Sequence, residues 1–370
     1  MNIIYDYQIF IDQVYGGPSR YFVKLIEEIL KKENVKISSA FYINSYLKQL
    51  PPKIISGFNL NRVFYEKIPY GLKKYLNTNL IKKINNHYLD IMIKNFKPDL
   101  IHRTNFEDYK TNLPVVLTVY DLIHEKYAYL YNKENHFRPK KKAIDRADEI
   151  ICISKNTLED LGNYYDLSNK KVSVVHLGYE LIKENEIDQN FTTFNDNFLL
   201  YVGKRMGYKN FYNFIKAYSL SEKLKKDFFI YCFGGGNFTK KENKIFKELG
   251  IQNKVKCFTG NDMQLIKMYK GASALIYPSK YEGFGLPILE AMSFECPVIC
   301  SNNSSVPEVG GDAVAYFDPL NIENIKDEIK KTLYSNSKIL DLKNKGKKRV
   351  SLFSWKKCAE ETTRVYKNLL

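Results

Sequence analysis

Residues 277–290 read Tyr-Pro-Ser-Lys-Tyr-Glu-Gly-Phe-Gly-Leu-Pro-Ile-Leu-Glu and lie between two apolar runs, 274–277 and 297–300. An apolar run, a glycine-containing loop, a short helical stretch and a second apolar run predict one strand–helix–strand unit of a parallel sheet. Pro287 falls where the helix should begin, and a proline there loses nothing because its missing N–H would have had no partner. The stretch therefore indicates an α/β fold.

The beginning of this expected helix has the chemistry of an anion site. Free backbone N–H groups around residues 283–286, together with the positive end of the helix dipole, face whatever lies above the sheet. Glycines allow a ligand to approach the backbone closely. Glu282 and Glu290 flank these amides, and carboxylates accept hydrogen bonds from sugar hydroxyls. The unit is therefore suited to hold a phosphorylated sugar.

The same string resembles the paired-glutamate motif of retaining glycosyltransferases of family 4, which have the GT-B fold. The match runs in order from Pro278 to Met292. The resemblance covers nearly the whole chain and is strongest between residues 200 and 320. It implies two doubly wound, Rossmann-like α/β domains facing across a cleft, the C-terminal one holding a nucleotide sugar and the N-terminal one presenting the acceptor. Glu290 would bind ribose hydroxyls, and the sugar and phosphate would be held by Glu282, Gly283, Phe284, Gly285 and Leu286.

Length and strand pattern agree with two domains. The chain has 370 residues, and a domain usually takes roughly 100–200. Short continuous apolar runs predict buried parallel strands at 3–5, 99–102, 114–119, 149–153, 172–175, 198–202, 228–233, 255–258, 274–277 and 297–300. We expect an N-terminal domain over 1–182, a linker over 183–197 and a C-terminal domain over 198–349. The last helix, about 350–370, resembles the family's closing helix, which packs back on the first domain.

Two cations follow the first strand of the C-terminal half. Arg205 and Lys209 stand in the stretch 201–210, Tyr-Val-Gly-Lys-Arg-Met-Gly-Tyr-Lys-Asn, between a strand and a helix. An arginine fork and a lysine point charge suit a diphosphate. A departing nucleoside diphosphate gains negative charge, so cations placed there bind the transition state better than the ground state. The string also resembles the phosphate-contacting pair of the family, and these two cations would make a metal ion unnecessary.

Other polar or glycine residues at the carboxyl ends of expected strands are candidates for substrate contacts. They are Gly16, Gly17, Arg20, His102, Tyr120, Asp121 and Asn302. Gly16 and Gly17 resemble the family's N-terminal glycine loop, and Asn302 begins a polar loop that is expected near the nucleotide. Tyr120 replaces a histidine that the family usually has before its aspartate. A tyrosine can donate a hydrogen bond but is no base near neutral pH, so Asp121 is the remaining polar candidate for catalysis there.

The net charge of +16 indicates an anionic partner. Basic residues concentrate at 73–83 and 138–142, and no nucleic-acid-binding motif is recognisable. The first stretch fits either an amphipathic helix on anionic lipid or a solvated helix face. The resemblance favours the membrane, since many such enzymes act on lipid-linked acceptors. We therefore expect a cytoplasmic protein, peripheral on the inner face of the cell membrane, with no nucleic acid as partner.

No transmembrane segment, signal peptide or metal site is expected. No apolar run approaches the ~18–20 residues that span a bilayer, and the first residues predict a strand. The six cysteines contain no Cys-x-x-Cys pair, and the five histidines have no zinc-like spacing.

The resemblance implies a retaining hexosyltransferase that moves a mannose- or rhamnose-type sugar. The donor would be a nucleoside-diphosphate sugar, a GDP-sugar rather than a UDP- or dTDP-sugar, with no further cofactor. The acceptor would be an oligosaccharide or a growing lipid-linked bacterial surface glycan, as in lipopolysaccharide O-antigen or capsule polysaccharide. Three alternatives stay open: a nucleotide-sugar epimerase, a non-catalytic nucleotide-sugar-binding protein because of Tyr120, and a nucleic-acid binder on charge alone.

Overall fold

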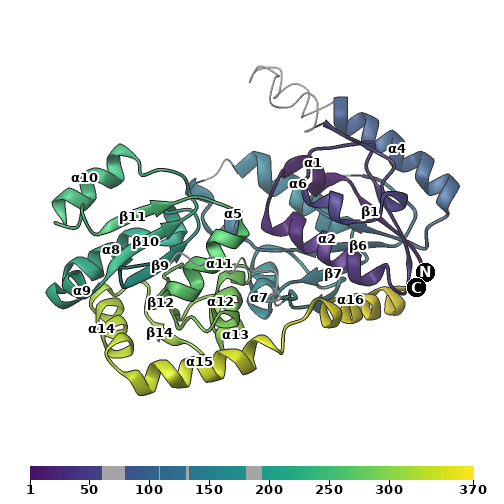
Figure 1. The fold of residues 1–370 in the computed structure, drawn as a ribbon. Helices are drawn as coiled ribbons and strands as arrows, with labels where there is room; N and C mark the ends of the chain where they lie inside the picture. The colour runs from purple at the N-terminus through teal and green to yellow at the C-terminus, as the bar shows by residue number, and fades with distance from the viewer. Residues whose placement is uncertain (61–79, 108, 131–132, 181–193) are drawn as a thin grey trace. The chain divides into compact units, whose positions relative to one another are not determined.

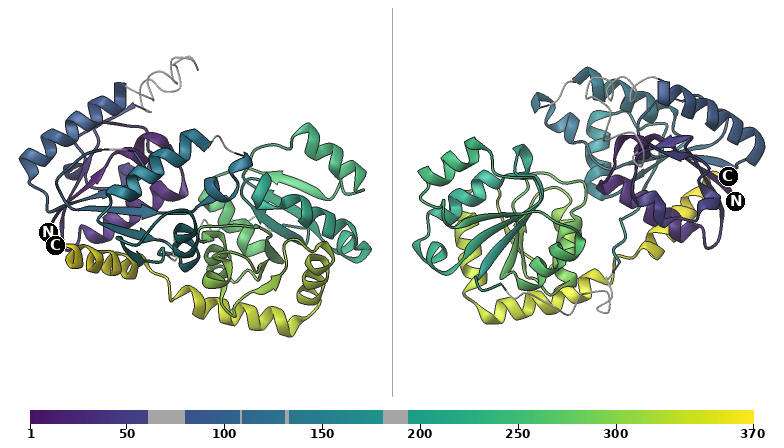
Figure 2. Two further views of the ribbon diagram at one scale, coloured as in Figure 1. Left: turned by 180° about the vertical axis from the view of Figure 1, so that it is seen from behind. Right: turned by 45° about the horizontal axis from the view of Figure 1, so that its top comes forward.

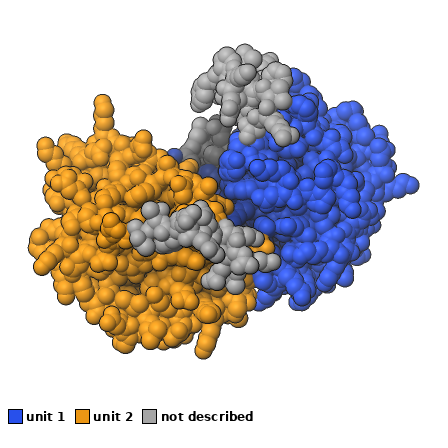
Figure 3. Space-filling model, viewed as in Figure 1, with its two compact units in different colours: residues 1–178, 354–370 blue, residues 179–353 orange. Residues whose placement is uncertain are grey.

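The computed structural model describes residues 1–60, 80–107, 109–130, 133–180 and 194–370. The chain divides into two compact units, residues 1–178 with 354–370 (unit 1) and residues 179–353 (unit 2) (Figure 3). The first unit thus ends a few residues before position 182, where the sequence pattern placed the boundary. The expected linker at 183–197 and the basic stretch 73–83 fall largely outside the described residues.

Unit 1 is built on a six-stranded parallel sheet of order β2-β1-β5-β6-β7-β8 (Figure 1). Its strands are β1 (Asn2–Asp6), β2 (Asn34–Ser38), β5 (Leu100–Arg103), β6 (Val115–Val119), β7 (Glu149–Cys152) and β8 (Lys171–Val174). A two-stranded parallel sheet joins β3 (Phe41–Tyr42) and β4 (Phe58–Asn59). The chain runs outward from β1 to β2 and then returns to β5 on the other side, which is the doubly wound arrangement.

Helices cover both faces of this sheet (Figure 2). They are α1 (Gln8–Asp12), α2 (Gly17–Ile29), α4 (Ile81–Phe96), α5 (Ile123–Lys126), α6 (Lys133–Arg146), α7 (Lys155–Tyr164) and α16 (Trp355–Leu369). Successive side chains of β1 point to opposite faces. Ile4 packs with Leu89 of α4, and Tyr5 contacts Phe22 of α2 and Tyr366 of α16.

Unit 2 repeats the architecture with a sheet of order β11-β10-β9-β12-β13-β14, again all parallel. Its strands are β9 (Phe198–Val202), β10 (Phe229–Phe233), β11 (Val255–Phe258), β12 (Ala274–Tyr277), β13 (Val298–Ser301) and β14 (Ala315–Phe317). Its helices are α8 (Phe211–Ser219), α9 (Glu222–Asp227), α10 (Lys240–Glu248), α11 (Asp262–Gly271), α12 (Leu286–Ser293), α13 (Val306–Gly310), α14 (Ile322–Leu333) and α15 (Asn336–Val350). The ten expected strands are confirmed, and β2, β3, β4 and β14 are additional.

No described helix is both long enough and apolar enough to cross a lipid bilayer.

The C-terminal helix is attached to unit 1 through a buried hydrogen-bond network. The Tyr366 hydroxyl lies 2.8 Å from the Tyr5 hydroxyl and 2.5 Å from His102 Nδ1, and His102 Nε2 lies 2.8 Å from Thr118 Oγ1. His102 is fully buried, so it does not face an open edge of the sheet as the sequence suggested. It points to the sheet face that α16 covers. Burial lowers the pKa of His102 to about 3, which keeps the imidazole neutral.

Replacing Tyr366 by phenylalanine should destabilise unit 1. The change leaves the buried Tyr5 hydroxyl and His102 Nδ1 without this partner, which should cost about 1–3 kcal/mol. Urea unfolding of wild type and Tyr366→Phe would measure the loss. Tyr129→Phe is the matched control, because the Tyr129 side chain is 80% exposed. Equal midpoints for wild type and Tyr366→Phe would contradict this account.

His102 should also make the protein less stable in acid. The unfolded chain takes up its proton near pH 6.5, whereas the folded pKa is about 3. Between these values the unfolded state binds more protons than the folded state. The contribution of His102 to stability is therefore complete above about pH 6.5 and decreases as the pH falls, by at most about 1.4 kcal/mol per pH unit. His102→Gln should remove this slope when urea unfolding is compared at pH 7.5, 6 and 5. Burial raises the pKa of Asp6 to about 6, which favours the folded state as the pH falls. This effect is the same in wild type and in His102→Gln. The same pH dependence of the unfolding free energy in wild type and His102→Gln would contradict this role of His102.

Candidate active site

The loop that carries the decisive sequence lies at the carboxyl edge of the second sheet. β12 is flanked by β9 and β13, so the loops that follow these three strands lie next to one another. The strand order reverses between β9 and β12, since the chain runs from β9 outward to β10 and β11 and returns to β12. Open α/β sheets bind ligands at this kind of switch point.

The start of α12 has the expected geometry. The helix begins directly after Gly285, which has φ 112° and ψ 48°. This left-handed conformation disfavours any residue with a side chain, and a Cβ there would also approach Ile288 Cδ1 to 3.2 Å. Pro287 occupies the first turn, as expected. Pro287 has no N–H, and the Ile288 amide donates to the Gly285 carbonyl at 3.0 Å. The affinity of this helix start for anions therefore rests on its dipole and on the Leu286 amide.

Two serines after β13 hold this loop in place. Ser304 Oγ accepts a hydrogen bond from the Glu282 amide at 2.9 Å. The Ser305 hydroxyl donates to the carbonyl oxygens of Glu282 and Phe284, at 2.8 and 2.9 Å. Asn302 itself is exposed, and its amide donates to the Phe317 carbonyl at 3.0 Å. The polar loop expected near the nucleotide therefore positions the glycine loop, with Asn302 at its surface.

Lys209 and Glu282 come together as a largely buried ion pair. Lys209 Nζ lies 2.7 and 3.0 Å from the two carboxylate oxygens of Glu282, and the side chains are 21% and 10% exposed. Asn210 orients the lysine loop, because its side-chain amide donates to the carbonyls of Pro278 and Pro319 at 3.0 and 2.8 Å. Asn210 also has a positive φ of 58°. The structure thus brings two of the predicted catalytic residues into contact.

Arg205 is hydrogen-bonded to the glycine loop that follows β10. Its Nε lies 2.7 Å from Glu242 Oε1, and its two terminal nitrogens donate to the carbonyls of Gly234 (2.9 Å), Gly236 (3.0 Å) and Asn237 (3.1 Å). The side chain is only 3% exposed. Burial opposes the charge, but the bond to Glu242 raises the pKa of Arg205 above its ordinary value. The guanidinium therefore fixes the shape of the 234–237 loop.

Gly235 shows how closely this loop wraps the arginine. Its φ is 74°, and a Cβ at this position would lie 2.9 Å from Arg205 Nη1 and 2.9 Å from the Gly203 carbonyl oxygen. A side chain would therefore displace either the guanidinium or the loop after β9. Glu242, which anchors the arginine, also closes the capping box of α10 with Thr239.

Glu290 projects from the second turn of α12. Its Oε2 accepts a hydrogen bond from the Tyr269 hydroxyl of α11 at 2.9 Å. Burial raises the pKa of Tyr269 well above its ordinary value, and Glu290 adds to the effect, so the tyrosine remains a donor. Tyr269, Asn210 and Glu242 were not candidates from the sequence. They are distant in the chain from the residues that they hold, and no local motif marks them.

The remaining candidates lie in unit 1. Gly16 and Gly17 stand at the start of α2, and Arg20 is on that helix. The Tyr120 hydroxyl donates to the Thr104 carbonyl at 3.1 Å, and burial raises its pKa well above its ordinary value. Asp121 Oδ1 accepts from the Ile123 amide at 3.0 Å, at the start of α5. The substrate contacts expected of these residues stay predictions.

Among the described residues, no group of three or more histidines, cysteines, aspartates or glutamates is placed to hold a metal ion.

Comparison with known families agrees with this architecture. The profile described as Glycosyltransferase Family 4 matches residues 15–182, and the profile described as Glycosyl transferases group 1 matches residues 182–349. The two profiles adjoin and together take in most of the chain. The chain therefore belongs to the glycosyltransferases of group 1 and family 4.

The chain is similar to several named proteins over part of their length. O-antigen chain mannosyltransferase B of Escherichia coli is 44% identical over 108 residues, which is 29% of this chain and 28% of that protein. Serotype-specific mannosyltransferase WbdA of Escherichia coli is 25% identical over 311 residues, 76% of this chain and 38% of that protein. The N-acetylgalactosamine-N,N'-diacetylbacillosaminyl-diphospho-undecaprenol 4-alpha-N-acetylgalactosaminyltransferase of Campylobacter jejuni is 27% identical over 219 residues, 58% of this chain and 59% of that protein. The chain spans less than two thirds of each of these relatives.

Solved structures with the same fold match over the full chain. Sucrose-phosphate synthase from Thermosynechococcus elongatus superposes with a TM-score of 0.74 at 17% identity, over 100% of this chain and 99% of that one. Anabaena HepE in complex with UDP-glucose superposes with a TM-score of 0.74 at 14% identity, over 100% of both chains. The expected GT-B fold, with two parallel-sheet α/β domains, is confirmed.

Replacing Arg205 by lysine should loosen the 234–237 loop without removing the charge. A single ammonium cannot reach Glu242 and three carbonyls together, and each lost charge-assisted bond is worth about 1.5–3 kcal/mol. Amide hydrogen exchange of this segment should then accelerate by about tenfold or more. Arg349→Lys is a matched control in the same unit, because Arg349 also donates to main-chain carbonyls, those of Glu308 and Val309. Unchanged exchange of 234–237 in Arg205→Lys would show that the guanidinium does not shape this loop.

Proposed function

We propose that this glycosyltransferase is a retaining hexosyltransferase that moves a mannose- or rhamnose-type sugar from a nucleoside-diphosphate sugar to a growing, lipid-linked bacterial surface glycan. The observation that carries the proposal is the Lys209–Glu282 pair, held beside the start of α12 at the switch point of the second sheet. The mannosyltransferase and O-antigen names of two relatives support the sugar and the glycan. The diphospho-undecaprenol in the name of a third supports a lipid-linked acceptor.

The donor diphosphate would lie over the start of α12, where the helix dipole attracts anions. Glu290 would accept hydrogen bonds from ribose hydroxyls, and Glu282 from a hydroxyl of the transferred sugar. Lys209 lies against Glu282 and would neutralise charge that develops on the diphosphate. Arg205 would act as a positioning residue, since its guanidinium holds the glycine loop after β10. A GDP-sugar is the donor that the family resemblance favours.

The proposed transfer retains the anomeric configuration. The bond between the anomeric carbon and the diphosphate oxygen breaks, and the acceptor oxygen bonds to that carbon on the same face. The acceptor proton passes to the departing diphosphate. Lys209 and the dipole of α12 stabilise the leaving group, so that no metal ion is required. Asp121 in unit 1 is proposed to contact the acceptor, and the protein is proposed to work at the inner face of the cell membrane.

A thermal-shift panel of GDP-, UDP-, ADP- and dTDP-sugars tests the donor site. A ligand at ~100 times its dissociation constant should add about 2.7 kcal/mol of stability, which gives a clear shift with one nucleotide class. Glu290→Gln should lose most of this shift because a neutral amide is a weaker acceptor for ribose hydroxyls. Glu248→Gln is the control, because that glutamate is 60% exposed at the end of α10. A shift that Glu290→Gln leaves intact would place the nucleotide elsewhere.

Turnover separates an enzyme from a binding protein. The assay uses the nucleotide sugar that raises the melting temperature, with a polyprenyl-diphosphate oligosaccharide as acceptor. Lys209→Met should lower kcat by about 10²–10³-fold, as does the loss of a single hydrogen bond to the transition state. Lys226→Met is the control, because this exposed lysine of α9 precedes β10 and so stands at the opposite edge of the same sheet. Product NMR should show retained anomeric configuration, and EDTA should have no effect. Donor binding without turnover on any acceptor tested would instead favour the non-catalytic binding protein.

A further inference from the structure

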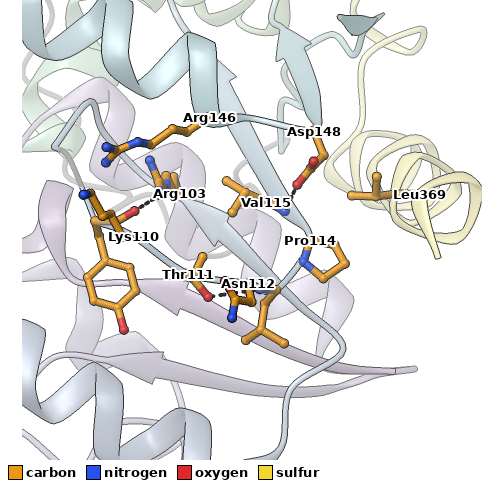
Figure 4. A pocket seen from close by; sticks show the side chains of 11 residues that line it. Arg103, Lys110, Thr111, Asn112, Pro114, Val115, Arg146, Asp148 and Leu369 are labelled. Atoms are coloured by element: carbon orange, nitrogen blue, oxygen red, sulfur yellow. Dashed lines mark hydrogen bonds between the residues drawn. The ribbon is translucent and has the colours of Figure 1, made fainter.

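A cavity lies in unit 1, mainly at the amino-terminal edge of its sheet. It has a volume of about 730 Å³ and is lined by the loop before β6 and by residues just before β7 (Figure 4). These positions are the amino-terminal ends of the two strands. Tyr120 and Asp121, the acceptor candidates, follow the carboxyl end of β6. Most of the lining is therefore away from that edge, and Arg103, the last residue of β5, reaches the cavity from a position beside Leu117 in the middle of β6.

Two arginines bring positive charge into this cavity. Arg103 ends β5 and is only 1% exposed, and Arg146 ends α6. Figure 4 shows both side chains reaching toward the same side of the cavity. Burial lowers the pKa of Arg103, the charges of Asp6 and Asp148 oppose this shift, and the charge of Arg146 adds to it. The two guanidinium groups are therefore close enough to repel one another.

The hydrogen-bond donors of Arg103 are only partly satisfied by the described residues. Its Nη2 donates to the Tyr109 carbonyl, but Nη1 is buried and has no hydrogen-bond partner among the described residues. Asp148, the carboxylate that lines the cavity, accepts the Val115 amide at 2.8 Å, and its charge balances part of that of Arg103. A buried cationic donor without an acceptor is costly, so the site is suited to an anion that offers several oxygens.

The other walls fit an organic molecule attached to that anion. Leu113, Pro114 and Leu369 form an apolar side, while Lys110 and Asn112 supply further polar groups. Small-molecule sites commonly have volumes of about 300–1,000 Å³ and combine apolar walls with a few polar groups. Phosphate is the anion whose oxygens best match two guanidinium forks.

We propose that this cavity binds a phosphate monoester or diester, with its phosphate between Arg103 and Arg146 and its organic part against Leu113, Pro114 and Leu369. The phosphate belongs either to a soluble metabolite or to a lipid headgroup. This site does not depend on the proposed glycosyl transfer, and it is outside unit 2, which holds the residues assigned to the donor.

Amide hydrogen exchange of residues 109–115 tests the site locally, so binding at the donor site cannot be mistaken for it. Wild type is measured with glycerol 3-phosphate in one arm and phosphatidylglycerol vesicles in the other. Sodium chloride at equal ionic strength and phosphatidylcholine vesicles are the respective blanks. We expect slower exchange of 109–115 with at least one phosphate source, and the arm that responds identifies that source.

Arg146→Gln should need at least ten times more ligand to reach the same protection, because one charge-assisted contact is lost. Lys94→Gln is the matched control, since Lys94 is an exposed lysine of α4. It should leave the protection unchanged. Absence of protection in wild type with both sources overturns the proposal, and this measurement needs no variant to fold. Equal protection in wild type and Arg146→Gln also overturns it.

Discussion

The hydrogen bonds that join the loops at the carboxyl edge of the second sheet are the constraint on which the site depends. Ser305 bonds to the carbonyls of Glu282 and Phe284, and Asn210 bonds to those of Pro278 and Pro319. These side chains are almost fully buried, so losing Ser305 or Asn210 would remove a donor from the carbonyls of Glu282, Phe284 or Pro278, at a cost of about 1–3 kcal/mol for each carbonyl left unpaired. The Pro319 carbonyl also accepts from Asn213. The ties fix the backbone before α12, and with it the position at which Lys209 meets Glu282. The chemistry of the motif therefore rests on residues outside it.

Arg205 illustrates how a charge suited to catalysis can serve the fold. Its position after β9 and its distance from Lys209 in the chain predicted a direct contact with a diphosphate. The structure surrounds it with Glu242 and with the carbonyls of Gly234, Gly236 and Asn237. A cation that neutralises carbonyl dipoles on one side of a loop leaves the amides of that loop free to face elsewhere. Arg205 can thus favour anion binding by orienting a backbone, whereas Lys209 can do so by its own charge.

The sequence was a good guide to buried strands and a poor guide to partners across the fold. Strands such as β9 and β12 are continuous apolar runs because both faces of a parallel sheet are covered. β2 and β14 were missed because β2, Asn-Val-Lys-Ile-Ser, alternates apolar with polar residues and β14 has only three residues, so neither is a continuous apolar run of ordinary length. The glycine-containing start of α12 was recognised from local chemistry alone. The burial of His102 could not be, since it depends on Tyr366, far along the chain.

The sequence is likewise a poor guide to which charged side chains are exposed. A net charge of +16 suggests an exposed basic surface, yet several of these cations are internal. Lys140, in the basic stretch 138–142, is 2% exposed and lies 2.9 Å from Glu125, which is itself buried. Arg205 is paired with Glu242 and loop carbonyls. Arg103 differs from both, because one of its terminal nitrogens is buried without a hydrogen-bond partner in the described part of the chain. Buried cations that carry complete shells of acceptors stabilise a fold, whereas one with an incomplete shell beside a cavity retains the capacity to bind an anion.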